Sequence, residues 1–200
     1  MIEFTRRADG IPRRLGILPG TFNPPTLAHL ALAHAATAQV DEVLFVLPRL
    51  FPHKLYEGAT FAERMEMLTA AADDSRFSVG SSDGGLFIEI ARECLEAYGE
   101  VELSFLCGRD AAERIVNWDY GDPAAFARML DEFDLRVASR GGAYEPPEHL
   151  APRIHALDME SGYDELSATE VRERIARGEP WQHLVPAVIV PMVQRIYGRT

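Results

Sequence analysis

The chain has 200 residues, of which 47% are apolar and 26% are charged, values typical of a compact globular domain. Its formal net charge of −11 argues against nonspecific binding to nucleic acid, although a local field can still bind a polyphosphate. No apolar window has the length needed to span a membrane, and the polar segment 1–14 lacks the apolar run of a signal peptide. We therefore expect a cytoplasmic protein that binds neither nucleic acid nor membrane.

Cysteine and lysine are both rare in this sequence. Cys94 and Cys107 lie in apolar stretches without the spacing of metal ligands, so we expect buried, reduced thiols and no structural metal. Lys54 is the only lysine among the 20 basic residues. A coding bias towards arginine accounts for this usage, and it makes Lys54 a candidate for a specific role.

Apolar runs of strand length alternate with helical patterns along the chain. The strand-like runs are 15–18, 43–47, 77–79, 101–107, 135–138 and 154–157. The helical patterns are 27–39, 60–72, 87–98 and 188–197, with two more helices that begin at Asp122-Pro123 and at Ser167. Thr60 with Glu63 matches the capping box that opens a helix. Ser167 with Glu170 matches it again, and Gly178 is expected to end that helix.

This alternation predicts an α/β fold. Continuous apolar strands that alternate with helices are typical of a parallel sheet covered on both faces. We expect a Rossmann-like, doubly wound sheet in a single domain, 1–200, with a small C-terminal helical portion over 160–200. Ligands of such sheets bind at the carboxyl ends of the strands, so the loop after the first strand is the first candidate site.

That loop runs from Gly20 to His29 and leads directly into a helix. Gly20 allows a tight turn or a close approach to a ligand. Thr26 can cap the helix, whose first amides attract anions, and His29 can direct a ring N–H at the same anion, with a charge-assisted bond if the ring is protonated. The residues alone are equally typical of a proline-stiffened turn, and they match neither the Walker A motif nor the dinucleotide glycine fingerprint.

The loop also resembles a known signature. Gly20-Thr21-Phe22-Asn23-Pro24 followed by Thr26-Leu27-Ala28-His29 resembles the motif of the nucleotidyltransferase superfamily, and within it the bacterial nicotinate-nucleotide adenylyltransferases. The resemblance implies that Thr26 and His29 contact the phosphates of ATP and that the loop residues before them line the nucleotide. Ala28 departs from the family glycine. The implied nucleotide-lining residues are Gly20, Thr21 and Phe22.

A second stretch, 166–172, resembles the family's Ile-Ser-Ser-Thr-x-x-Arg motif. Taken alone, it is a well-capped start of an amphipathic helix, where hydroxyls, amides and an arginine make an anion site. The resemblance implies that Ser167, Thr169 and Arg172 hold the outer phosphates. Ala168 replaces the motif's second serine. Both motifs together, in this order, are much more specific than either one.

The middle of the chain extends the resemblance. Pro52-His53-Lys54 matches the family's Pro-His-Lys, which implies that Lys54 contacts the acceptor, and Arg64 with Met67 matches its Arg-x-x-Met-Leu helix. Gly108 and Asp110 match a Gly-x-Asp motif at a strand end, where Asp110 would cap the next helix or bind the nucleotide.

Two further segments have counterparts in the family. Trp118 resembles the family's downstream tryptophan, which implies that it would stack on the acceptor's aromatic base, although such a residue also packs in cores or lids. Ser139-Arg140-Gly141 ends a strand and would bring Arg140 close to the nucleotide. The family's acceptor motif, Tyr-Thr-x-Asp-Thr, is replaced here: Phe87 and Ile90 stand in place of its two threonines.

The resemblance implies direct adenylyl transfer, in which an acceptor phosphate attacks the α-phosphorus of ATP and pyrophosphate leaves. Thr26 and His29 are assigned to the reacting centre, and Thr169 and Arg172 to the leaving pyrophosphate. Mg²⁺ is expected to arrive with ATP, and nicotinate mononucleotide is the expected acceptor. The alternatives are a transfer from ATP or CTP to another phosphate ester and a catalytically silent nucleotide-binding module. The oligomeric state stays open, a homo-oligomer included.

Overall fold

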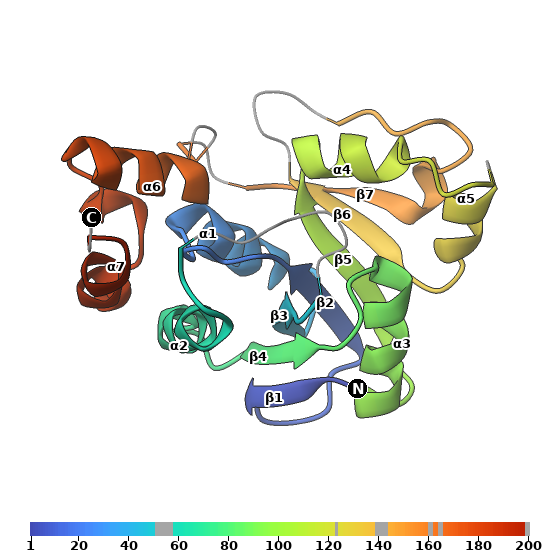
Figure 1. The fold of residues 1–200 in the computed structure, drawn as a ribbon. Coiled ribbons are helices and arrows are strands. Elements are labelled where there is room, and N and C mark those ends of the chain that lie inside the picture. Colours follow the sequence, from blue (N-terminus) through green and yellow to red (C-terminus); the bar gives the residue numbers. More distant parts are fainter. Residues whose placement is uncertain (51–57, 123, 139–143, 160–161, 164–165, 199–200) are drawn as a thin grey trace.

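The computed structural model describes residues 1–50, 58–122, 124–138, 144–159, 162–163 and 166–198. Its centre is a seven-stranded sheet of order β1-β4-β3-β2-β5-β6-β7 (Figure 1). The strands are β1 Glu3–Arg6, β2 Arg14–Pro19, β3 Glu42–Pro48, β4 Phe77–Ser82, β5 Glu102–Gly108, β6 Asp134–Ala138 and β7 Ile154–Leu157. The helices are α1 Leu27–Ala36, α2 Phe61–Ala71, α3 Phe87–Tyr98, α4 Arg109–Val116, α5 Ala125–Met129, α6 Ala168–Arg177 and α7 Val190–Tyr197. Short 3₁₀ turns lie at η1 Ala151–Arg153, η2 Gln182–Leu184 and η3 Ala187–Ile189.

The predicted α/β fold is confirmed. Across the sheet from β4 through β3, β2, β5 and β6 to β7, each strand is parallel to its neighbours. Counted without β1, the strands follow the order 3-2-1-4-5-6 of a doubly wound sheet, and the order reverses between β2 and β5. The crevice for a ligand in such a sheet lies at this reversal, outside the carboxyl ends of the strands. The loop after β2 and the start of α4 after β5 therefore flank the expected binding position.

Helices cover both faces of the sheet. Neighbouring residues of a strand point to opposite faces, so each of the two contacts the helices on its own face. Ile17 packs in one buried cluster with residues of α3, α4 and α5. Its neighbour Leu18 packs in another cluster with residues of α1 and α2. A third cluster joins α2 to the C-terminal helices and includes the fully buried Met67, Val171 and Val193. The small C-terminal helical portion thus docks on α2 rather than on the sheet.

The N-terminal segment contains a strand that its polarity did not suggest. Glu3–Arg6 pairs antiparallel with β4 and forms the edge of the sheet. Ile2 is buried and Phe4 packs beside it against the core, while Arg6 donates to the carbonyl of Ala72. Two apolar residues in alternation are enough for an edge strand but too short a pattern to stand out in sequence.

Other element boundaries also differ from the predicted ones. The first helix ends at Ala36 rather than at residue 39, and the Thr37 hydroxyl donates to the carbonyl of His34 at 2.6 Å. The fifth helix starts at Ala125 rather than at Asp122 and residue 123, since Asp122 instead accepts the N–H of Ala124 in a turn. Local side-chain hydrogen bonds of this kind compete with helical ones.

A buried carboxylate lies where the strands of the sheet begin, at their amino ends. Glu42, at the start of β3, is 3% exposed and accepts hydrogen bonds from the hydroxyls of Ser78 and Tyr98. Nearby, Cys94 is a buried free thiol, as is Cys107, and burial raises the pKa of each thiol to about 12. The expectation of buried thiols that form no disulfide is therefore confirmed. Among the described residues, no helix is long and apolar enough to cross a membrane.

Candidate active site

The loop after β2 is packed around one aromatic ring. The N–H of Gly20 donates to the carbonyl of Val46 at 3.0 Å. Phe22 has a positive φ of 45°, and its buried ring makes edge contacts with Phe45 and with the imidazole of His29. The ring of Phe22 thus packs edge-on against His29 and is buried away from solvent.

A side chain at position 20 would collide with this ring. A Cβ built on Gly20 lies 2.9 Å from the Phe22 ring, so we expect Gly20→Ala to lower the free energy of unfolding by about 1–3 kcal/mol, the usual range for overpacking a buried site. Urea denaturation measures this change. Because the collision is with the ring, adding Phe22→Leu to Gly20→Ala should recover part of the loss. An unchanged denaturation midpoint in Gly20→Ala would show that the ring moves aside without cost.

Thr26 and His29 form a local unit at the start of α1. Thr26 is fully buried and is the N-cap of the helix. Its backbone N–H donates to Nδ1 of His29 at 3.0 Å, and its hydroxyl lies 2.8 Å from the same nitrogen. Because Nδ1 accepts, the ring proton is on Nε2. The expected N–H donor of His29 is therefore Nε2–H of a neutral ring, and its orientation is set by Thr26.

Three side chains from other helices hold the same loop. Arg64 of α2 donates from Nη1 to the carbonyl of Thr21 at 3.1 Å. Arg172 of α6 donates from Nη1 to the carbonyl of Asn23 at 2.6 Å. Tyr197 of α7 donates to Oδ1 of Asn23 at 2.6 Å. Helices distant in sequence therefore converge on this loop, and the beginning of α6 lies beside the beginning of α1 (Figure 1).

The start of α6 provides the second predicted motif. Ser167 is its N-cap and accepts the N–H of Glu170 at 3.1 Å. The reciprocal half of the predicted capping box is not made, because the Glu170 carboxylate pairs with Arg174 at 2.6 Å. Nη2 of Arg172 lies 3.4 Å from the hydroxyl of Thr169. Thr169 and Arg172 thus lie together at the helix start. The carbonyl that Arg172 contacts belongs to Asn23, 149 positions before Arg172 in the sequence.

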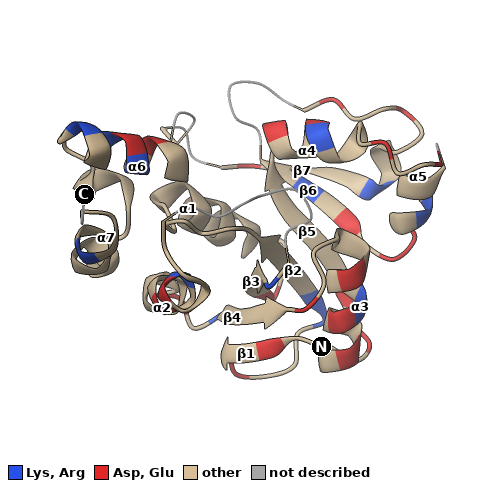
Figure 2. Cartoon of the chain, viewed as in Figure 1, with Lys and Arg blue, Asp and Glu red and all other residues tan. Residues whose placement is uncertain are grey.

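The charge around the loop suits a polyphosphate, although the whole chain is acidic. The α1 sequence from Leu27 to Ala36 contains no acidic residue, and in Figure 2 this helix shows neither red nor blue, whereas acidic residues colour much of α3. Arg64 and Arg172 add positive charge at the loop carbonyls. Local charge of this kind decides binding at a site.

The carboxyl end of β5 carries the third group of predicted residues. Gly108 is the N-cap of α4, and Asp110 is an exposed residue of the helix's first turn. Asp110 therefore does not cap the helix, and its predicted contact with the nucleotide stays a prediction. Trp118 follows the end of α4 and is 49% exposed, which excludes a place in the core.

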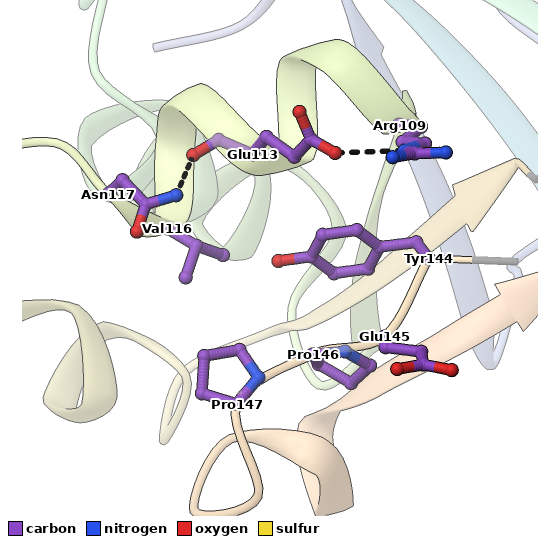
Figure 3. A pocket seen from close by; sticks show the side chains of 8 residues that line it. All are labelled: Arg109, Glu113, Val116, Asn117, Tyr144, Glu145, Pro146 and Pro147. Carbon is purple, nitrogen blue, oxygen red and sulfur yellow. Dashed lines mark hydrogen bonds and ion pairs between the residues drawn. The ribbon is translucent and has the colours of Figure 1, made fainter.

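A cavity of about 520 Å³ lies beside α4, between that helix and the segment 144–147 (Figure 3). Arg109 and Glu113 form an ion pair of 2.8 Å along its helix side. Tyr144 lies beneath them, and burial raises its pKa. The residues around the cavity come from α4 and from 144–147, so it is distinct from the loop that precedes α1.

The segment in place of the family's acceptor threonines packs into the core. Ile90 is fully buried, and the Phe87 ring stacks on Phe105 with a centroid distance of 4.3 Å. The Glu89 carboxylate accepts the N–H groups of Gly85 and Leu86 at 2.9 and 3.0 Å. At the start of α3, the apolar side chains therefore pack into the core, and the backbone N–H groups before the helix bind the Glu89 carboxylate.

Two of the predicted site residues lie outside the described residues: Lys54, with its neighbours Pro52 and His53, and Arg140. Sequence reasoning missed Asn23 and Tyr197 as parts of the site. Asn23 stands at the second variable position of the family's Gly-x-Phe-x-Pro stretch, which the first motif resembles. A lone tyrosine in the last helix carries no signal that would link it to residue 23.

Comparisons with known proteins identify the family of the chain. The model of the cytidylyltransferase-like family matches residues 17–174. The probable nicotinate-nucleotide adenylyltransferase of Exiguobacterium sibiricum is 30% identical over 90% of this chain and 96% of its own, and that of Geobacter sulfurreducens is 32% identical over 92% and 98%. The Plasmodium falciparum nicotinic acid mononucleotide adenylyltransferase complexed with NaAD shares the fold, with a TM-score of 0.72 at 16% identity over 92% of this chain and 95% of that one.

The chain belongs to the cytidylyltransferase-like family. Within it, the chain is an enzyme of the nucleotidyltransferase class that is similar to the nicotinate-nucleotide adenylyltransferases.

Proposed function

We propose that the chain transfers the adenylyl group of ATP to nicotinate mononucleotide and releases pyrophosphate, a step of NAD biosynthesis. The observation that carries this proposal is the hydrogen bond from Arg172 to the carbonyl of Asn23. It joins the start of α6 to the loop that holds Thr26 and His29, which supports the proposal that both helix starts bind one ligand. The curated relatives named above support the choice of acceptor.

In the proposed reaction, an acceptor phosphate oxygen attacks the α-phosphorus of ATP. The new oxygen–phosphorus bond forms as the bond between the α-phosphorus and its bridging oxygen breaks, and pyrophosphate leaves with that electron pair. Nε2–H of His29 donates to a phosphate oxygen as negative charge develops, and Thr26 holds the ring. Arg172 and Thr169 bind the leaving pyrophosphate. Catalysis then depends on positioning and charge stabilisation rather than on a protein nucleophile.

We propose that the remaining predicted residues complete the two substrate sites. Backbone groups of Gly20, Thr21, Phe22 and Gly108 line the nucleotide, as do the side chains of Asp110, Arg140 and Ser167. Lys54 and the exposed Trp118 bind the acceptor. The domain acts as one unit in the cytoplasm, and residues 160–200 complete its ATP site.

We propose that Mg²⁺ enters bound to the phosphates of ATP. Among the described residues, no group of three or more histidines, cysteines or carboxylates is arranged to hold a metal, while the exposed Thr169 carries a hydroxyl oxygen of the kind Mg²⁺ accepts. This arrangement fits a cation held largely by substrate and water. The bound cation would neutralise charge on the phosphates.

A second acceptor class is favoured by one observation. Phe87 and Ile90, which replace the family's threonines, pack into the core, and Glu89 occupies the amides before them. This arrangement suits an acceptor without a carboxylate at this place, such as the amide of nicotinate mononucleotide or another phosphate ester.

One assay separates these possibilities. Pyrophosphate release is measured with Mg²⁺ and either ATP or CTP against nicotinate mononucleotide, its amide and several unrelated phosphate esters. We expect turnover with ATP and nicotinate mononucleotide. Preference for the amide or for another ester would change the acceptor and keep the reaction. Binding of ATP without pyrophosphate release for any acceptor would identify a catalytically silent module.

A further inference from the structure

Tyr197 connects the last helix to the loop that precedes α1. Its hydroxyl donates to Oδ1 of Asn23 at 2.6 Å across 174 positions of sequence. Burial raises the pKa of the Tyr197 hydroxyl, so the group stays protonated and able to donate. Asn23 itself is 6% exposed. This hydrogen bond is therefore largely shielded from water, where such bonds are strongest.

Asn23 is held from two directions at once. Arg172 contacts its backbone oxygen at 2.6 Å, and Tyr197 contacts its side-chain oxygen. The contact is closely packed, because a Cβ built at Gly58 would lie 3.1 Å from the Tyr197 ring and 3.4 Å from Oδ1 of Asn23. Only two residues separate Asn23 from Thr26, whose N–H and hydroxyl orient the imidazole of the predicted catalytic histidine.

The helix that carries Tyr197 is firmly attached to the body of the protein. Ile189 and Val193 are fully buried in the cluster that α7 shares with α2. Arg195, at the other side of the helix, forms an ion pair with Glu66 of α2 at 3.2 Å. Because α7 is anchored in this way, the position of the Tyr197 hydroxyl is fixed relative to α2, and α7 can impose that position on the loop.

We propose that Tyr197 is a positioning residue for nucleotide binding. Its hydroxyl orients Asn23 and thereby fixes the position of Thr26 and His29 relative to Arg172. The inference rests on the proposed function, since it concerns the same triphosphate. It assigns to α7 a part in shaping the loop that precedes α1.

The test compares Tyr197→Phe with the wild-type protein. This variant keeps the ring and removes the one donor, and a single hydrogen bond corresponds to roughly three- to tenfold in an equilibrium. We expect the Kd for ATP, measured by titration calorimetry, and the KM for ATP, measured by pyrophosphate release, to rise by about that factor. The KM for the acceptor should not change. A general loss of folded protein would lower turnover and leave both KM values as they are.

Tyr98→Phe is the matched control. It also removes a half-buried tyrosine hydroxyl that donates to a side-chain oxygen, here that of Glu42, but at the amino ends of the strands, away from the loop. We expect both variants to lower the melting temperature by a few degrees and only Tyr197→Phe to weaken ATP binding. Equal ATP affinity in wild type and Tyr197→Phe, or equal weakening in both variants, would overturn the proposal.

A double-mutant cycle locates the effect. Asn23→Ala removes the acceptor Oδ1 and keeps the backbone oxygen that Arg172 contacts. If Tyr197 acts through Asn23, then Tyr197→Phe should have no further effect on the Kd for ATP in the Asn23→Ala background. Additive losses would overturn the inference. Should Tyr197→Phe fail to fold, Asn23→Ala carries the test, with the same rise in Kd expected. Wild-type protein that does not bind ATP would reject the proposed function instead.

Discussion

His29→Ala is expected to lower kcat by roughly 10²–10³, the effect of removing one hydrogen-bond donor that acts on charge developing in a transition state. The structural reason is the orientation of the ring. Nδ1 of His29 is engaged by the N–H and hydroxyl of Thr26, and the Phe22 ring packs edge-on against the imidazole. Nε2–H is therefore held in one direction before substrate arrives. Pyrophosphate release at saturating ATP and acceptor measures the change.

His34→Ala serves as the control for this prediction. His34 lies about one and a half turns further along α1, where it faces Asp73 at 3.3 Å and packs on Phe77. We expect this variant to keep wild-type turnover. Unchanged turnover in His29→Ala would remove His29 from the mechanism and leave its contact with Thr26 as a helix cap alone.

Much of the fold follows from sequence periodicity. The continuous apolar runs in β3 and β5 and the helical pattern of α3 are long enough to define their element types, and α3 begins and ends as predicted, with Gly99 at its end. The edge strand β1 could not be predicted in this way. Its order depends on pairing with β4, because the isolated sequence offers only Ile2 and Phe4 to bury.

The candidate site was predictable wherever a motif lies within one contiguous segment. Thr26 and His29 interact over three positions, so their spacing carries the information. Asn23 and Tyr197 meet over 174 positions, and the tertiary packing of α7 on α2 alone determines that contact. Sequence patterns report local periodicity, and they carry no signal for a single hydrogen bond between distant elements.

Arg172→Ala is expected to lower kcat/KM for ATP by about 10²-fold, the scale for losing one preorganised charged contact to a leaving group on which charge develops. Nη1 of Arg172 is engaged with the carbonyls of Asn23 and Ala168 at 2.6 and 3.1 Å, which fixes the guanidinium plane. The same plane presents its other N–H groups towards the side on which Thr169 lies. Loss of the arginine removes both the charge that we propose holds pyrophosphate and the link between α6 and the loop.

Two further variants divide that effect into its parts. Arg172→Lys keeps the charge without the planar fork, so we expect it to recover about tenfold of the loss and no more. Arg174→Ala, on the same helix, removes an arginine that pairs with Glu170 and the carbonyl of Pro180, and we expect it to keep wild-type kcat/KM. If Arg174→Ala lost as much activity as Arg172→Ala, the helix as a whole would matter and not the contact of one guanidinium with the loop. Full activity in Arg172→Lys would mean that the charge suffices and that the geometry at Asn23 has no part in catalysis.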